Sequence, residues 1–343
     1  MAEELIALEN PVELSRDLVL GYKPQTFLRQ MCSTITHRTS SFLIDVQKKT
    51  RQAAPYVRDD DDATYIARDG YETLQYKPVP VKPARNITAR DIEKRAVGAN
   101  VVTISGETAG NETIQSGIEL ADLLDLQDSI ERTEECQIAE ILSTGKLVTG
   151  VSADINAPIP SSHIFTASSA DRFDNPNADP IKWLRNVNSK KVVKDGGYSS
   201  KYAICGGAAF DALVGNTKLQ NFLDNRNIHF GNINPNQNNE FPGVVYQGRI
   251  LGIDFYTYDE FYFDAGTSSE KAVIPEDRII LIGGGARLEM HYAAIYDGAR
   301  GTVNKTQTYA YTYVEKKTKW LELESKPLFV PVNGGAIVSA KVV

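Results

Sequence analysis

The chain has 343 residues, of which 42% are hydrophobic and 24% are charged, so it can bury the core of one large domain or of two to three smaller ones. This composition is close to the average for globular proteins and excludes wholesale disorder. The net charge of -7, from 37 Lys and Arg against 44 Asp and Glu, argues against a surface dedicated to wrapping nucleic acid phosphates.

Cysteine usage and the first residues bear on the compartment. Cys32, Cys136 and Cys205 are odd in number and lack CxxC spacing, so neither a disulfide framework nor a zinc site is indicated. The start, MAEELIALENPVELSRDLVL, is acidic and lacks the basic and apolar regions of a signal peptide. No apolar run approaches the roughly 20 residues that span a bilayer. We therefore expect a soluble protein, made in the cytoplasm, without membrane contact.

The first predicted elements are a short helix over TFLRQMC (26–32) and a strand over SSFLIDVQKKT (40–50). The segment 55–98 contains alternating stretches such as TYIAR and VPVKP, which favour extended strands over helices. Because this segment has little to bury, we predict an extended arm. Four prolines interrupt it, namely Pro55, Pro78, Pro80 and Pro83.

The strongest periodic signal covers 117–147, where apolar residues recur at i, i+3 and i+4 and predict a long helix. Ser116 and Glu119 fit a capping box at its start, and Gly145 followed by Lys146 fits its end. Polar positions interrupt the apolar stripe in the middle, so one side of the helix is expected to face other surfaces or water. The residues expected to pack on a sheet are Leu120, Leu124, Ile138 and Ile141.

Further along, the polar stretch 150–180 reads as an extended loop, and 181–194 reads as a short helix. KYAICGGAAFDALVGN (201–216) predicts a buried strand that enters a helix at Gly206-Gly207. From 241 to 296, β-branched and aromatic runs separated by glycines predict strands with tight turns. The C-terminal end adds strands broken at Pro327, Pro331 and Gly334-Gly335. The predicted fold class is therefore α+β.

The aspartates at 59–62 suggest metal binding, because hard cations bind clustered carboxylate oxygens. Counted from Asp59, a calcium-binding loop of the EF-hand type needs glycine at the position of Thr64 and glutamate at the position of Gly70. The spacing therefore rejects that loop, and a solvated acidic turn is the favoured interpretation.

Nothing in the sequence converges on catalysis. Gly283–Gly285 follow an apolar strand but fit neither GxGxxG nor GxxxxGK[ST], so a tight turn or bulge is the better interpretation. The four histidines lie too far apart in the sequence for ligand pairs such as HExxH. There is no GxSxG, and Cys205 lies in an apolar strand as a buried thiol. We predict no catalytic, cofactor-binding or metal site.

The arm at 55–98 is segregated in charge, with the aspartates in its first half and mainly lysine and arginine in its second half. An extended segment of this length gains little from its own burial, so it should become ordered by lying on another surface. Opposite charges on neighbouring copies would guide such packing. A plain exposed hairpin is the alternative. The candidate inter-subunit contacts are Asp59, Asp60, Asp61, Asp62, Arg68, Lys77, Lys82 and Arg85.

In this order, the segments resemble the phage major capsid protein E family, which has the Hong Kong 97-type shell fold. FLRQMC and FLIDVQKK resemble the N-terminal arm and first strand, and ARDGYETLQYKPVPVKPARNITARDIEKRAVG resembles the extended loop. LLDLQDSIERTEECQIAEILSTGKL resembles the spine helix of the peripheral domain. KYAICGGAAFDALVGNTKLQNFLDNRN, GVVYQGRILGIDFYTYDEFYFD and IPEDRIILIG resemble the axial domain, and ESKPLFVPVNGGAIVSAKVV resembles the closing strand.

The resemblance implies five regions. These are an N-terminal arm with the first strand (1–54), the extended loop (55–98), a peripheral domain with the spine helix (99–195), an axial domain (196–318), and a closing strand that returns to the peripheral domain (319–343).

The resemblance also implies a structural subunit rather than an enzyme, which assembles as pentamers and hexamers into an icosahedral shell around packaged double-stranded DNA. Such a subunit is part of the virion and is assembled in the host cytoplasm. Its expected partners are a portal protein, scaffolding or decoration proteins, and the DNA, contacted on the inner face without sequence specificity. The acidic balance agrees, because a shell that bound its DNA tightly would resist packing and release. The alternatives are another phage structural, tail or binding protein, and an enzyme with an unrecognised site.

Overall fold

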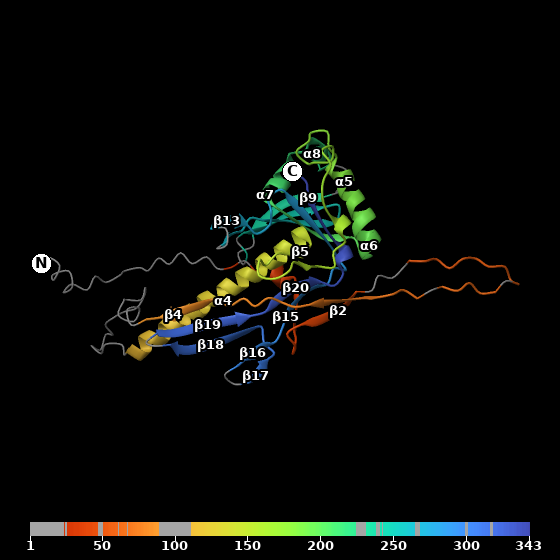
Figure 1. The fold of residues 1–343 in the computed structure, drawn as a ribbon. Coiled ribbons are helices and arrows are strands. Elements are labelled where there is room, and N and C mark those ends of the chain that lie inside the picture. The colour runs from red at the N-terminus through yellow and green to blue at the C-terminus, as the bar shows by residue number, and fades with distance from the viewer. Residues whose placement is uncertain are drawn as a thin grey trace, which may run out of the picture. The chain divides into compact units, whose positions relative to one another are not determined.

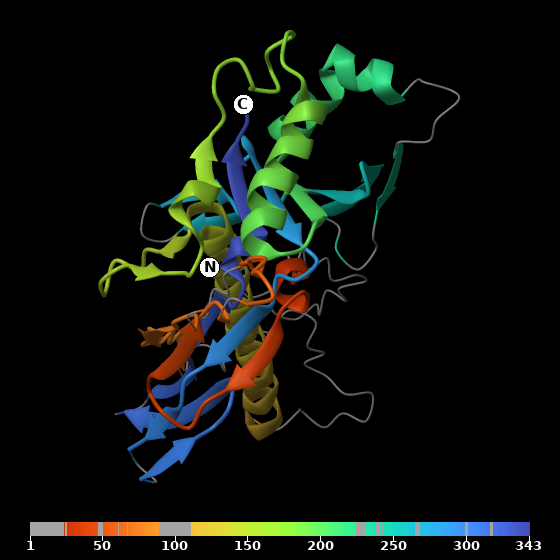
Figure 2. The same cartoon turned by 90° about the vertical axis from the view of Figure 1, so that its right-hand side faces the viewer.

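The structure is a computed structural model. It describes residues 24, 26–46, 51–60, 62–66, 68–88, 111–223, 231–237, 241, 243–264, 268–298, 301–315 and 318–343. The chain divides into two compact units, which are described separately (Figures 1 and 2). The strands and helix of unit 1 come from Lys82–Ile130 and Ala310–Glu324, and unit 2 comprises Gln25–Val81, Glu131–Tyr309 and Ser325–Val343.

A seven-stranded mixed sheet forms the centre of unit 2. The strand order is β7-β21-β14-β8-β11-β10-β9. Its middle strands have buried side chains on both faces, which explains why they read in the sequence as nearly continuous apolar runs. The strands are β7 Ile164–Thr166, β8 Ser200–Cys205, β9 Gly231–Gln237, β10 Val244–Ile250, β11 Ile253–Tyr258, β14 Arg278–Gly283 and β21 Ile337–Lys341.

Helices cover one face of this sheet. The first run consists of α5 (Pro180–Val187), a π-helical turn η2 (Asn188–Val193) and α6 (Lys194–Gly196), and it begins where the Asp179 carboxylate accepts a hydrogen bond from the Lys182 amide at 3.0 Å. The second pair is α7 (Gly207–Gly215) and α8 (Thr217–Leu223). The predicted helix over 181–194 and the predicted strand-to-helix turn at Gly206-Gly207 are both confirmed.

The other face packs against a second apolar cluster. This cluster includes the C-terminal part of α4 (Asn111–Thr144), the short helix α2 (Phe27–Gln30), and the strands β15 (Leu288–Tyr292) and β20 (Pro327–Pro331), which form a three-stranded sheet with β1 (Ser33–Thr36). The predicted end of the long helix is confirmed, because Gly145 has φ 75° and its amide donates to the Ile141 carbonyl at 2.8 Å.

The start of α4 differs from the prediction. The helix begins at Asn111 rather than at 117, so Ser116 and Glu119 lie inside it and not in a capping box. The stretch NETIQS (111–116) contains no glycine or proline that would stop the helix, which allows it to extend further towards the N-terminus.

The predicted loop over 150–180 is also more ordered than expected. It contains β6 (Ile155–Asn156), which pairs with β5 (Lys146–Leu147), a 3-10 turn η1 (Ser161–His163), and β7 at the edge of the main sheet. The pattern of so short a strand is too weak to detect, and β7 is fixed instead by its parallel pairing with β21, which is distant in the sequence. A further 3-10 turn, η3 (Gly334–Ala336), precedes β21.

Three two-stranded antiparallel ribbons complete unit 2. They are β2 (Phe42–Val46) with β3 (Glu72–Tyr76), β12 (Phe261–Asp264) with β13 (Ser269–Ala272), and β16 (Ile295–Asp297) with β17 (Thr302–Asn304).

Unit 1 consists of the part of α4 up to Ile130 and a three-stranded sheet of order β18-β19-β4. The strands are β18 (Thr308–Glu315, in this unit from Ala310), β19 (Thr318–Ser325) and β4 (Ala84–Ile87). Leu321 and Leu323 alternate inward along β19, and the rings of Tyr313 and Trp320 stack with centroids 6.4 Å apart. No helix in the described part of the chain is long and apolar enough to cross a membrane.

Candidate assembly surfaces

A long loop leaves unit 2 between β2 and β3. The two strands pair from Phe42 opposite Tyr76 to Val46 opposite Glu72, so the loop 47–71 starts and ends on adjacent strands. It contains no helix or strand among its described residues, and it extends away from the sheets of unit 2 as a narrow hairpin (Figure 1). Loops of more than about 12–15 residues without secondary structure are uncommon and mostly functional. We call this segment the β2–β3 loop.

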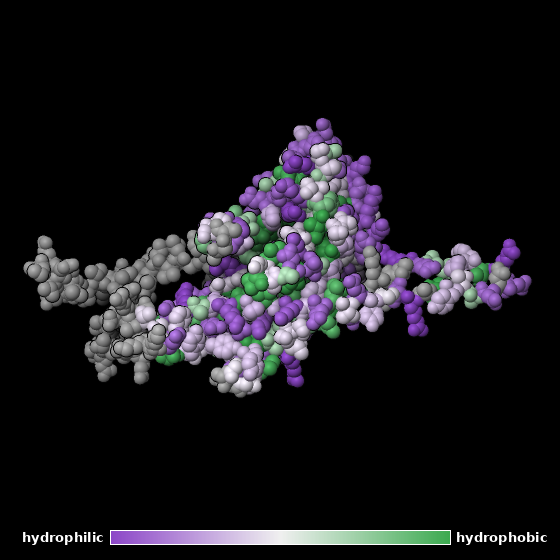
Figure 3. All heavy atoms as spheres, viewed as in Figure 1, coloured by the Kyte–Doolittle hydropathy of each residue, from purple (hydrophilic) through white to green (hydrophobic). Residues whose placement is uncertain are grey.

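The β2–β3 loop exposes large apolar side chains. Tyr56 is 104% exposed, Tyr65 and Tyr71 are also largely exposed, and the smaller Val57 and Ile66 are about half exposed. In the space-filling view, hydrophobic and hydrophilic side chains are interspersed along the loop (Figure 3). Exposed aromatic side chains without a core beside them are typical of a surface that contacts another molecule.

The acidic run lies at the turn of this loop. Asp59 and Asp60 form the turn, Asp62 follows, and all three are exposed, whereas Asp61 lies outside the described residues. Arg68 is exposed on the returning side. Within the part of the chain that the structure describes, the three aspartates have no ion-pair partner. The loop therefore presents its negative charge to the surroundings.

The remaining predicted contacts are basic and lie elsewhere. Lys77 is exposed just after β3 in unit 2. In unit 1, the Lys82 amine lies 3.1 Å from the Glu324 carboxylate. Arg85 donates hydrogen bonds of 2.7 Å to both Asp122 and Asp125, and these bonds, with that to Asp122 foremost, raise its pKa. Lys82 and Arg85 keep 47% and 46% of their side chains exposed. The described members of the predicted set therefore belong to both units, Lys82 and Arg85 to unit 1 and the others to unit 2.

A stack of three rings holds the start of the β2–β3 ribbon. The Phe42 ring packs against His37, at a centroid distance of 4.5 Å, and against His291, at 4.6 Å, and the two histidine ring centroids are 5.2 Å apart. The His37 Nε2 and His291 Nδ1 atoms are 2.9 Å apart. Burial lowers the pKa of His37, and burial together with the neighbouring His37 lowers that of His291 to about 4. Both imidazoles are therefore neutral at pH 7. Sequence reasoning missed this pair, because only the pairing of β1 with β15 brings the two histidines together.

Two buried carboxylates of α4 hold α2. Glu135 accepts hydrogen bonds from the amides of Leu28, at 2.8 Å, and Arg29, at 3.0 Å, and from the Tyr258 hydroxyl, at 2.8 Å. Its neighbour Glu134 accepts from Arg29 Nε at 3.2 Å and from the Tyr292 hydroxyl at 2.8 Å.

Burial raises the pKa of Glu135 to about 7, and the hydrogen bonds act in the opposite direction. The polar positions that interrupt the α4 stripe thus bind the N-terminal segment of the chain. The sequence predicted that this polar side of the helix faces water or other surfaces. For Glu134 and Glu135 that prediction is wrong, because both are buried and bind α2.

The apolar residues of α4 follow the prediction only in its second half. Ile138 and Ile141 are buried, as predicted, but Leu120 is 60% exposed and Leu124 is 54% exposed, so the prediction that these two pack on a sheet within the chain is wrong. In the first half the buried face passes through Leu126 and Ile130 instead. Leu120 and Leu124, one turn apart in unit 1, form an exposed apolar pair.

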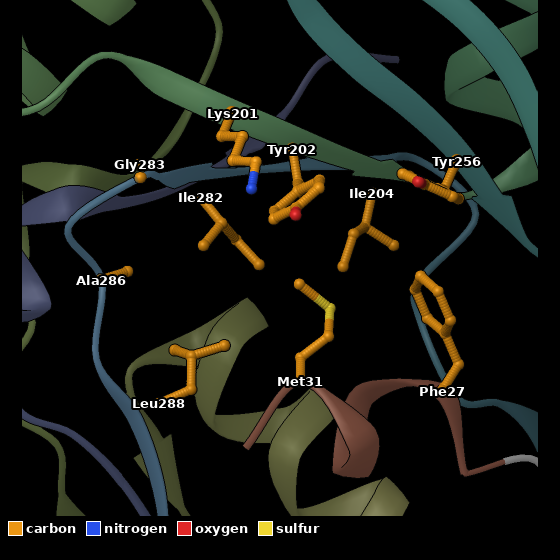
Figure 4. A pocket seen from close by; sticks show the side chains of 11 residues that line it. Phe27, Met31, Lys201, Tyr202, Ile204, Tyr256, Ile282, Gly283, Ala286 and Leu288 are labelled. Carbon is orange, nitrogen blue, oxygen red and sulfur yellow. The ribbon is translucent and has the colours of Figure 1, made fainter. Parts of the chain in front are cut away.

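A cavity of about 290 Å³ lies between α2 and the sheet of unit 2 (Figure 4). Its lining is mainly apolar, and its polar side chains are those of Lys201, Tyr202 and Tyr256. The lining holds no carboxylate, imidazole or thiol, so it offers no acid–base pair or nucleophile of those kinds. The apolar side chains around it are Phe27, Met31, Ile204, Ile282, Ala286 and Leu288.

Other residues considered for chemistry show the same character. Burial raises the pKa of the Cys205 thiol well above its usual range, which makes it unreactive, as predicted. Gly283 ends β14 at a register shift, which confirms a bulge followed by a turn at the triple glycine. No group of three or more metal-ligating side chains occurs among the residues the structure describes.

Solved structures that share this arrangement along nearly the whole chain include capsid proteins. An E. coli CFT073 prophage protein described as a capsid protein has a TM-score of 0.67 at 15% identity, covering 99% of this chain and 98% of that chain. The capsid of the native GTA particle has a TM-score of 0.58 at 12% identity and covers 100% and 98%. The mature capsid of bacteriophage PhiM1 has a TM-score of 0.53 at 13% identity and covers 97% and 91%.

The chain therefore has the Hong Kong 97-type capsid fold, which confirms the predicted fold. The model of the phage major capsid protein E family matches residues 17–342, and the chain belongs to that family. It is a structural component of a virion shell rather than a member of an enzyme family. No curated protein sequence gives a significant match.

Proposed function

We propose that this major capsid protein of a tailed phage-like particle builds an icosahedral shell from pentamers and hexamers of itself. The observation that carries the proposal is the β2–β3 loop, which extends from unit 2 with its tyrosines exposed. A closed shell of identical chains needs heterologous contacts, in which a feature of one copy meets a different feature of the next. An extended loop with no core of its own is suited to such a contact.

We infer that the loop lies on a neighbouring copy, and that its aromatic and charged residues make different contributions to this contact. Covering a fully exposed tyrosine contributes roughly 2 kcal/mol, whereas an exposed ion pair contributes about 0–1 kcal/mol. Tyr56, Tyr65 and Tyr71 therefore supply most of the affinity. The charged residues set the register between neighbouring copies and raise the rate of association. These residues are Asp59, Asp60, Asp61, Asp62, Arg68 and Lys77. Lys82 and Arg85 contact the neighbouring copy through the exposed parts of their side chains, because each already pairs with carboxylates of its own chain.

We also propose the five family regions for this chain. The N-terminal arm and first strand span 1–54, the extended loop 55–98, the peripheral domain 99–195, the axial domain 196–318 and the closing strand 319–343. The positions of the β2–β3 loop and α4 support the second and third regions. The regions describe the order along the chain, since β7 and β21, from the third and fifth regions, join the same sheet as the strands of the fourth.

The remaining partners follow from the same proposal. A portal protein occupies one vertex, scaffolding or decoration proteins contact the shell, and double-stranded DNA fills its interior. The DNA is contacted without sequence specificity, and the net charge of -7 disfavours tight binding.

Electron microscopy and light scattering of the purified protein, alone and with its phage partners, test the proposal. Rings or closed shells are the expected result, and a protein that stays monomeric under every assembly condition would contradict it. Replacing residues 53–69 with a short Gly-rich turn keeps β2 and β3 and should leave a folded subunit by circular dichroism that no longer forms stable shells. A Gly-Ser loop of the original length is the matched control for loop length, and it should fail in the same way, because it lacks the tyrosines and aspartates.

A further inference from the structure

The helical run 180–196 of unit 2 carries a basic face. Its apolar side chains, Trp183 and Leu184 among them, are buried against the sheet. Four cations lie on the outside with spacings of three to five residues, which places them along one side of the run. In Figure 2 this green helical run faces the viewer. We call this set the basic face, and its residues are Lys182, Arg185, Lys190 and Lys194.

The charge of the basic face is not compensated within the described part of the chain. None of its four residues forms an ion pair there, and Arg185 lies only over the Phe222 ring, at 5.9 Å. The neighbouring Lys191 differs, because it points inwards, bonds the Ser162 carbonyl and lies 3.7 Å from the Phe165 ring centroid. Like charges on successive helical turns repel each other, so this face gains from an anionic partner.

An acidic edge lies at one end of the main sheet. The parallel strands β8 and β11 end there and the antiparallel β14 begins there, since Cys205 lies beside both Thr257 and Ile279. Three exposed carboxylates follow from this topology, and we call them the acidic edge: Asp211 in α7, Asp259 after β11 and Glu276 before β14. Partial burial, with Asp211 and Glu276 nearby, raises the pKa of Asp259. Within the described residues no cation pairs with any of the three.

The helices that carry the basic face and Asp211 cover the same face of the sheet, and they lie at different margins of unit 2. In Figure 1, α5 and α6 form its right-hand margin, whereas α7 and β13 lie on its left. Figure 2, seen from that right-hand side, has the run 180–196 in front. A ring of copies related by rotation joins one margin of each copy to a different margin of the next.

We propose that the basic face of one copy docks on the acidic edge of the next copy around each ring of the shell. This inference rests on the proposed function and adds which two sides of the subunit meet. Complementary charge would guide the copies into this register, and it would oppose the reversed arrangement, in which like faces meet. A second copy is favoured over DNA as the partner, because the same chain supplies the matching carboxylates while its net charge is -7.

Charge reversal tests this docking. One variant reverses the basic face by Lys190→Glu with Lys194→Glu, and another reverses the acidic edge by Asp211→Lys with Glu276→Lys. All four side chains are exposed, so circular dichroism and the Tm should stay near wild type. Each variant alone should lose about tenfold or more of its assembled fraction, measured by light scattering and electron microscopy. The control is Lys305→Glu, an exposed lysine after β17, which should assemble normally.

Recombination makes the test specific. All four substitutions in one chain should restore rings, because both faces are reversed together. An equal mixture of the two double variants should form only rings with alternating copies, so six-membered rings appear and five-membered rings do not.

Several results would overturn the inference. They are normal assembly of either double variant, a folded four-substitution chain that stays unassembled, and five-membered rings in the mixture. If the Lys190→Glu and Lys194→Glu variant assembles normally but loses salt-dependent binding to a short DNA duplex, the basic face binds nucleic acid instead. A wild-type protein that never assembles would overturn the proposed function and this inference with it, whereas wild-type rings with unaffected variants would overturn this inference alone.

Discussion

Some residues of this subunit stabilise its fold, as Glu135 does, whereas others, such as Tyr56, serve contacts between copies by our proposal. Glu135 is buried, holds the backbone of α2 by two hydrogen bonds and accepts a third from the Tyr258 hydroxyl, so it serves the stability of unit 2. Tyr56 is fully exposed and, by our proposal, serves contacts between copies. Substitutions at the two positions should therefore separate folding from assembly.

The pKa of Glu135 gives a pH dependence of known sign. Its value of about 7 in the folded state lies above that of an exposed glutamate, so the folded state holds the proton more tightly. The contribution of Glu135 to stability is therefore greatest below the unfolded pKa and decreases as pH rises towards about 7. Glu135→Gln removes this proton, so its free energy of unfolding should decline less between pH 5 and pH 8 than that of wild type, measured by urea denaturation. Asp128→Asn on the same helix is the control, and an equal decline in Glu135→Gln and wild type would contradict the prediction.

The tyrosines of the β2–β3 loop allow a complementary test. Tyr56→Ser combined with Tyr65→Ser should leave the Tm of the isolated subunit unchanged, because both side chains are exposed. Loss of roughly 2 kcal/mol of contact energy per tyrosine should raise the critical concentration for assembly by at least about tenfold. The matched control, Tyr56→Phe with Tyr65→Phe, keeps the apolar area and should assemble like wild type. Equal assembly of the Ser and Phe variants would show that the rings do not contact a neighbour.

At the scale of elements, the sequence predicted best what local chemistry decides. The end of α4 at Gly145 and the turn from β8 into α7 depend on residues within a few positions of each other, and both are confirmed. The β7 pairing and the attachment of α2 to α4 depend on partners far away in the sequence, and these were missed. The prediction that Leu120 and Leu124 pack on a sheet was wrong for another reason. Periodicity shows that apolar residues share one face of a helix, but it does not show whether the same chain covers that face.

The two faces of α4 make this distinction testable. Leu124→Asp should change the free energy of unfolding by about 0.5 kcal/mol or less, because the side chain is already half exposed. Ile130→Asp, on the same helix, should cost about 3 kcal/mol or more, because Ile130 is 1% exposed and the charge would be buried. Chemical denaturation of both variants measures the difference. A large loss of stability in Leu124→Asp would show that the exposed pair is covered within the subunit.

At the scale of the whole molecule, charge is arranged in patches rather than spread evenly. The position of the aspartates at the tip of an extended loop could be predicted, because proline and charge patterns show where the chain extends. The pairing of Arg85 with Asp122 and Asp125 could not, because no local pattern links residues 37 and 40 positions apart. The basic face had a signal in its lysine spacing, but only the buried opposite side of the helix shows which way those lysines point.

This arrangement predicts a specific response to salt. Raising NaCl from about 0.05 M to about 0.5 M shortens the screening length and should slow assembly several-fold, because charge guides association. Shells already formed should dissociate much less, because the tyrosine contacts do not depend on ionic strength. Time-resolved light scattering measures the first effect, and the remaining shell fraction after transfer to high salt measures the second. Salt that dissolves formed shells as readily as it slows assembly would contradict this division.

The ring stack of His37, Phe42 and His291 has a mechanical consequence. From Val46 to the turn at Asp59 and Asp60, the β2–β3 loop can extend up to about 40 Å at roughly 3.3 Å per residue. At that length, a tilt of about 10° at its root would move the tip by about 7 Å. Three close-packed rings leave little room for such a tilt, so they fix the direction in which the loop leaves unit 2. The small angular differences between five-fold and six-fold rings would then be absorbed along the loop rather than at its base.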